Sequence, residues 1–137
     1  MNRYMDAHVH LKNRNDKVMN LPELFQEMDA AEIEKVFLMP SNSTRVENER
    51  MLSQVKGHED RFIPFAFINP YHEDCVEWFR DAVLRRGVKG LKLHPVCDAY
   101  PADRAYLLDP LLEICDHHHL HCIIHCTSDA PNSSPLQ

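Results

Sequence analysis

The feature that most constrains the fold is the regular return of short apolar runs along the chain. Runs of strand length begin at positions 5, 36, 62, 88 and 121, at spacings of 31, 26, 26 and 33 residues. Between them, apolar side chains recur every three or four residues, as they do on one face of a helix. Because no hairpin signal joins any two runs, we expect five parallel strands linked by right-handed helical crossovers.

The segments between the predicted strands carry recognisable boundary signals. Asn20 can cap the first helix, and Pro22 lies in its first turn, where the missing N–H costs nothing. Residues 12–19, just before this helix, are predicted to form a polar loop. Gly87 is predicted to end the third helix in a left-handed conformation, and Asp109 with Pro110 is predicted to start the fourth.

Two architectures accommodate five such strands. A (β/α)₈ barrel of about 250 residues averages roughly 31 residues per unit, which matches the spacing here, although only five strands are present. A doubly wound five-stranded sheet is the alternative, and its usual size suits 137 residues. Asp6, Lys92 and His125 are polar residues inside predicted strands, and the inward face of a barrel near its C-terminal rim can be polar. We therefore predict part of a TIM-like barrel.

The first predicted strand, Tyr4 to Leu11, carries two histidines one residue apart. Since alternate side chains on a strand share a face, Asp6, His8 and His10 are expected to point one way. Two imidazoles at one strand end can bind a single divalent ion at roughly 2.0–2.1 Å, given a further ligand from elsewhere. Asp6, one layer deeper, is predicted to orient a ligating imidazole.

Two later strands also end in histidine, at the edge where parallel α/β proteins build their sites. A catalytic metal typically has three protein ligands and an open position, so we predict His125 as a ligand beside His8 and His10. His94 could bind metal or substrate, and Lys92, on the same face, could serve a metal bridge, a substrate or an ion pair. His94 and Lys92 are the candidate catalytic residues. An imidazole-rich ligand set favours zinc, with manganese as the alternative.

The remaining histidines and cysteines are assigned no chemistry. The run at 117–119 and His121 lie at a helix C-terminus and a strand start, where imidazoles commonly meet terminal carbonyls. His58 and His72 fall in connections and are predicted to lie on the surface. The five cysteines are an odd number and are predicted to be reduced thiols, with Cys126 facing away from His125.

Composition narrows the compartment and the partners. A net charge of −6 and a pI near 5.9 argue against a nucleic-acid surface, so a small-molecule substrate is expected. The chain holds no long apolar run and no basic segment followed by an apolar core at its start, so we expect neither a membrane span nor a secretory signal. The cytoplasm is the expected compartment.

Three blocks of sequence resemble the amidohydrolase-related branch of the amidohydrolase superfamily. Residues 6–11, DAHVHL, are similar to the first-strand D-x-H-x-H. Residues 87–95, GVKGLKLHP, resemble the fourth-strand G-x-K-G-x-K-L-H-P and form the most specific block. Residues 121–125, HCIIH, are similar to the fifth-strand P-V-x-I-H.

This resemblance implies a distorted (β/α)₈ barrel with one or two divalent ions. It implies hydrolysis of C–N, C–O or lactone bonds, or nonoxidative decarboxylation, with His8, His10 and His125 as metal ligands. Members also carry a sixth-strand histidine and an eighth-strand aspartate that acts as general base, and neither has a counterpart here. We therefore expect residues 1–128 to be the truncated N-terminal portion of such a barrel, and we expect self-association through its open edges. Residues 129–137 are expected to form a polar tail.

Two other functions remain open at this stage. Metal-dependent nucleases and phosphoesterases built on related barrels also begin with H-x-H, although the acidic charge counts against them. The chain could also be an inactive half-barrel that acts as an interaction module.

Overall fold

The computed structural model describes residues 4–11, 13–14, 17–18 and 20–126. The predicted tail at 129–137 lies outside the described residues. The main sheet has five strands: β1 (Tyr4–His10), β4 (Ile33–Met39), β5 (Phe62–Phe67), β6 (Gly90–Leu93) and β7 (His121–Ile124). The four helices are α1 (Leu21–Ala30), α2 (Arg45–Val55), α3 (Cys75–Arg85) and α4 (Ala105–His117). None of the helices in the described part of the chain is both long enough and apolar enough to cross a membrane.

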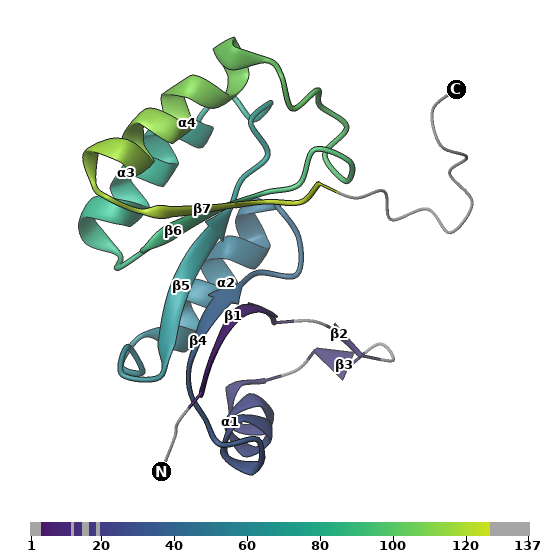
Figure 1. Cartoon of the computed structure of the whole chain (residues 1–137), viewed down its shortest axis with the longest axis vertical. Coiled ribbons are helices and arrows are strands. Elements are labelled where there is room, and N and C mark those ends of the chain that lie inside the picture. Colours follow the sequence, from purple (N-terminus) through teal and green to yellow (C-terminus); the bar gives the residue numbers. More distant parts are fainter. Residues whose placement is uncertain (1–3, 12, 15–16, 19, 127–137) are drawn as a thin grey trace.

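The five strands follow one another in sequence order across the sheet, β1-β4-β5-β6-β7, and every neighbouring pair is parallel. A doubly wound sheet would reverse direction at a switch point, which this order does not do. Figure 1 shows α1 and α2 beside β4 and β5, and α3 and α4 beside β6 and β7. The prediction of five parallel strands and four helices of a partial barrel is confirmed.

One predicted loop is wrong in part. Two short antiparallel strands, β2 (Asn13–Arg14) and β3 (Lys17–Val18), pair within the segment that was expected to be a polar loop. Each strand has only two residues, which is too short to leave an alternating pattern in the sequence. The expectation that the chain contains no hairpin therefore fails at this point, while the parallel main sheet is unaffected.

The start of the last helix is also corrected. α4 begins at Ala105, so Asp109 is not its cap and Pro110 lies inside the helix. The first turn has already formed before the proline, since the N–H groups of Leu107 and Leu108 both donate to the carbonyl of Arg104. Burial of Leu108 in the core supports this turn, an example of tertiary packing overriding a local boundary signal.

The other boundary signals behave as expected. The Oδ1 atom of Asn20 accepts the N–H of Glu23 over 3.0 Å and caps α1. Gly87 has a φ of 76°, the left-handed conformation predicted after α3. Apolar side chains of all four helices join those of β4, β5 and β6 in one core. The helices thereby hold the five strands in register, so that their C-terminal ends lie along one edge.

A buried amide fixes the end of β5. The Nδ2 atom of Asn48, on α2, donates to the carbonyl of Phe67 over 2.8 Å, and its Oδ1 atom accepts the Phe67 N–H over 3.0 Å. Asn48 is only 2% exposed. Its side chain therefore acts as a substitute strand partner, and it holds Phe67 at the edge where the candidate site lies.

Candidate functional site

The candidate site is a pocket of about 360 Å³ at the C-terminal edge of the sheet. Strand ends supply its imidazole, ammonium and phenyl groups, and the loops after β4 and β6 supply the remaining polar groups. Its lining residues are His8, His10, Ser41, Asn42, Ser43, Phe67, Lys92, His94, Cys97, Asp98 and His125. All five predicted ligand and catalytic candidates thus lie on one pocket wall, and Asp6 does not line it.

The two histidines of β1 approach each other through their Nε2 atoms. Their Nε2 atoms are 2.9 Å apart, and their ring centroids are 4.9 Å apart. The register between β1 and β4 shifts between Asp6 and Val9, which marks a β-bulge in the part of β1 that holds His8. Bulges re-aim side chains, and this one interrupts the strict alternation that the sequence suggested.

One hydrogen bond orients the His10 imidazole, and another holds the backbone at His8. The Nδ1 atom of His10 lies 2.8 Å from the carbonyl of Pro40. Because a carbonyl can only accept, Nδ1 is the donor, and the lone pair of the neutral ring is on Nε2. Asp6 accepts the backbone N–H of His8 over 2.9 Å, so this bond holds the His8 backbone at the bulge rather than an imidazole ring.

Lys92 is a buried cation beneath these histidines. Its side chain is 1% exposed, and its Nζ atom lies 3.4 Å from Nε2 of His8. Residues on the parallel strand β6 alternate in direction, which places Lys92 and His94 on the same side as predicted. The Lys92 amine therefore lies in the pocket beside the histidine pair.

His94 and His125 form a stack. Their ring centroids are 3.9 Å apart with an interplanar angle of 11°, and Phe67 stacks near His94 at 6.2 Å and 19°. β7 ends at Ile124, and His125 follows it with its N–H donated to Leu93 over 3.0 Å. His125 therefore packs face to face with another imidazole in this structure.

The donor set fits a metal ion in part. Two nitrogens bound to one tetrahedral zinc ion, each at roughly 2.0–2.1 Å, would be about 3.3 Å apart, so the 2.9 Å separation of the His8 and His10 Nε2 atoms is slightly shorter than a shared ion requires. The carbonyl of Pro40 further fixes His10 in the ligating tautomer. Among the described residues, however, no group of three or more His, Cys, Asp or Glu side chains is placed to hold a metal. The structure therefore brings together two of the three predicted ligands, and His125 does not complete the group.

Five loop residues in the pocket wall were not predicted, and two of them, Ser43 and Asp98, contact each other. Ser43, after β4, donates its hydroxyl to Oδ1 of Asp98, after β6, over 2.6 Å. The Oδ2 atom of Asp98 is buried without a hydrogen-bond partner among the described residues. Burial raises the pKa of Asp98 above its usual value, while the Ser43 hydrogen bond and the charges of His94 and His72 lower it. No sequence pattern marks these residues, because the contact joins two irregular loops.

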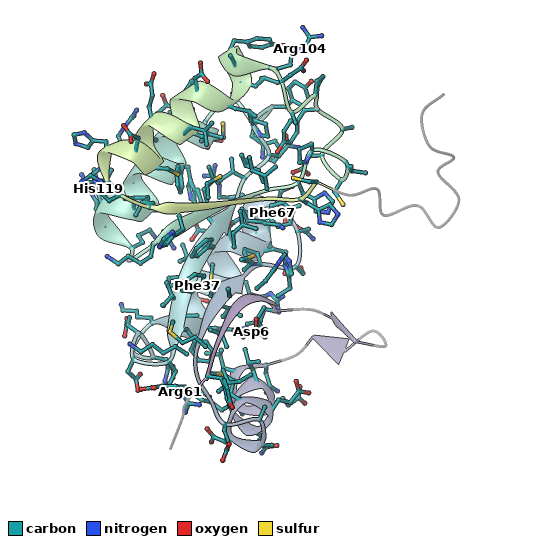
Figure 2. All side chains as sticks on the ribbon, in the orientation of Figure 1. Asp6, Phe37, Arg61, Phe67, Arg104 and His119 are labelled. Carbon is teal, nitrogen blue, oxygen red and sulfur yellow. The ribbon has the colours of Figure 1, made fainter. Side chains whose placement is uncertain are left out.

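Four of the histidines that were assigned no chemistry, at positions 117–119 and 121, lie at the other end of the sheet. Figure 2 shows His119 at the turn between α4 and β7 and Phe67 toward the opposite end of the strands. The rings of His117 and His118 pack edge to face at 4.8 Å, and the His121 ring stacks on Phe37 at 6.1 Å. These residues do not line the pocket described above.

Comparison with solved structures supports the same architecture. A probable 2-pyrone-4,6-dicarboxylic acid hydrolase from Acinetobacter baumannii aligns with a TM-score of 0.68 at 13% identity, covering 90% of this chain and 49% of that one. The 5-carboxyvanillate decarboxylase of Sphingomonas paucimobilis aligns with a TM-score of 0.68 at 14% identity, covering 90% and 51%. An amidohydrolase II aligns with a TM-score of 0.67 at 16% identity, covering 97% and 53%. The chain thus spans about half the length of each of these proteins.

No curated protein matches the chain at a significant level. The family model described as amidohydrolase matches residues 5–136, nearly the whole chain. Together with the half-barrel fold, this match shows that the chain belongs to the amidohydrolase family.

Proposed function

We propose that this chain provides the metal-binding half of a metal-dependent hydrolase or nonoxidative decarboxylase that acts on a small organic molecule. The observation that carries the proposal is the convergence of the His8 and His10 Nε2 atoms to 2.9 Å on the wall of a pocket. The names of two structural neighbours, a hydrolase and a decarboxylase, support both reaction types. The chain spans about half of those proteins. The proposed activity is therefore that of a complete (β/α)₈ barrel and not of these five strands alone.

His8 and His10 would hold the ion through Nε2, with His125 as the candidate third protein ligand. Zinc suits such imidazole ligands, with manganese as the alternative. When bound, the ion would supply a Lewis acid and lower the pKa of a water molecule. The carbonyl of Pro40 would keep the Nε2 lone pair of His10 available for it.

Other groups in the pocket are suited to substrate binding. The buried ammonium of Lys92 would attract an anionic group, such as a carboxylate, and would stabilise negative charge that develops on the substrate. His94 is held in a fixed orientation by His125 and would offer a directed hydrogen bond. Ser43 and Asp98, in the loops after β4 and β6, would contact polar groups of the substrate.

Metal content tests this proposal directly. Protein expressed without a histidine tag should bind about one zinc ion per chain, measured by elemental analysis and by calorimetric titration after chelation. The His8→Ala/His10→Ala double variant should lose at least about tenfold in affinity. His117→Ala removes an exposed imidazole at the far end of the sheet and serves as the matched control.

The outcomes separate the alternatives. Zinc binding that is unchanged in the double variant would contradict the assigned ligands. A folded protein that binds no divalent metal would favour the interaction-module function instead.

We further propose self-association through the edge strands β1 and β7, where Tyr4, Met5 and Ile124 are exposed, and a cytoplasmic location. Sedimentation of purified protein that shows only monomer would contradict the association.

A further inference from the structure

A cysteine and a histidine form a close pair in the pocket wall. The Sγ atom of Cys97 lies 3.5 Å from Nε2 of His94. His94 is only 8% exposed, while Cys97 is exposed and lines the same pocket. A nucleophile beside an oriented imidazole is the arrangement that activates thiols in proteins. The metal-dependent chemistry proposed above makes no use of this thiol.

A second contact determines which nitrogen carries the proton. The backbone N–H of Cys97 donates to Nδ1 of His94 over 3.2 Å. Because an N–H group can only donate, Nδ1 holds the lone pair, and the proton of the neutral ring is on Nε2. The Nε2–H group therefore faces the Cys97 sulfur as a hydrogen-bond donor.

Stacking holds this donor in place. The His94 ring stacks on that of His125 at 3.9 Å and 11°, and the ring of Phe67 lies near it at 6.2 Å and 19°. Asn48 in turn fixes Phe67 at the end of β5 through two backbone hydrogen bonds. The imidazole therefore needs no reorganisation to stabilise a negative charge on the sulfur.

We propose that Cys97 is a covalent modification site for small α,β-unsaturated carbonyl compounds that enter the pocket. The thiolate is the reactive form of cysteine, and a hydrogen bond from Nε2–H stabilises it. In the reaction, the thiol first gives its proton to water. The sulfur electron pair then forms a C–S bond to the β-carbon, the C=C π pair shifts to form an enolate, and the α-carbon takes a proton back from water. The adduct would occupy part of the 360 Å³ pocket.

Cys126 provides a matched reference within the same molecule. It is also exposed, and its thiol donates to the carbonyl of Ile124 over 3.4 Å. Among the described residues, it makes no hydrogen bond with an imidazole. Cys75 and Cys115 are buried, so their labelling would report unfolded protein.

The test is brief exposure of the full chain to N-ethylmaleimide, followed by digestion and mass spectrometry of each cysteine peptide. Cys97 should be labelled at least about tenfold faster than Cys126, since its sulfur faces the Nε2–H donor of His94. His94→Phe keeps a ring for stacking but removes the Nε2–H donor, and it should bring the Cys97 rate close to that of Cys126. Cys126→Ser should leave the Cys97 rate unchanged.

Two results would overturn the proposal. One is equal labelling of Cys97 and Cys126 in the wild-type chain, and this comparison needs no variant to fold. The other is a Cys97 rate that His94→Phe leaves unchanged while the variant remains folded, as judged by unlabelled Cys75 and Cys115.

Discussion

Ser43 and Asp98 are 55 positions apart in the sequence and are joined by a hydrogen bond of 2.6 Å across the mouth of the pocket. The bond links the loop after β4 to the loop after β6, so it fixes the relative positions of two walls of the site. It is also the one hydrogen bond that the described residues provide to the Asp98 carboxylate, whose Oδ2 atom is buried and unpaired among them. The stability of the pocket rim therefore depends on this pair.

The first prediction concerns that bond. Ser43→Ala should lower the free energy of unfolding by about 1–2 kcal/mol, because it leaves a half-buried carboxylate without its donor. Urea unfolding followed by circular dichroism measures the change. Ser53→Ala, which removes an exposed hydroxyl from the surface of α2, is the matched control and should change stability by less than about 0.5 kcal/mol. Equal losses in the two variants would contradict the role given to Ser43.

The second prediction concerns pH. Burial raises the pKa of folded Asp98 above the unfolded value of 3.8, so the folded state holds this proton more tightly. The resulting stabilisation is fully present below pH 3.8 and is lost as the pH rises through the raised folded pKa. As the pH rises from 3.8 through the folded pKa, the free energy of unfolding of Asp98→Asn should therefore fall less than that of the wild type. Asp60→Asn controls for net charge at an exposed position, and parallel curves for wild type and Asp98→Asn would contradict the expectation.

The third prediction concerns the amide that ends β5. Asn48→Ala should cost about 2–4 kcal/mol of unfolding free energy, because it leaves both the N–H and the carbonyl of Phe67 buried without this partner. Chemical denaturation measures the loss. Gln26→Ala, on the exposed face of α1, should be nearly neutral. A cost for Asn48→Ala below about 1 kcal/mol would mean that the amide does not hold the strand end.

The fourth prediction concerns the contact between β5 and β6. A Cβ atom added at Gly90 would clash with the ring of Phe65, whose side chain is fully buried. Gly90→Ala should therefore cost about 1–3 kcal/mol through overpacking. Phe65→Leu frees this space, so the double variant should be more stable than the sum of the two single losses implies. A double-mutant cycle measures the coupling, and strictly additive losses would contradict the clash.

Much of the fold could be predicted from sequence because the signals are local. The spacing of apolar runs predicted the order and parallel pairing of the five main strands, since a strand followed by a helix leaves few ways to pack. The capping role of Asn20 and the positive φ of Gly87 are likewise properties of adjacent residues. Because the C-terminal ends of parallel strands meet at one edge, the same reasoning predicted one shared pocket for His8, His10, Lys92, His94 and His125.

Contacts between distant segments decided the rest. The bulge in β1, the start of α4 before Pro110, and the stacking of His125 on His94 depend on neighbouring strands and core packing. The Asp98 bond to Ser43 and the Cys97 contact with His94 arise in irregular loops, where no periodicity relates sequence to position. Sequence alone determined which strand ends carry reactive side chains, because the alternation of side chains along a strand and the order of the strands depend on nearby residues. Only the tertiary structure determined which of those side chains touch, because contact distances depend on how the whole sheet curves and how its loops pack.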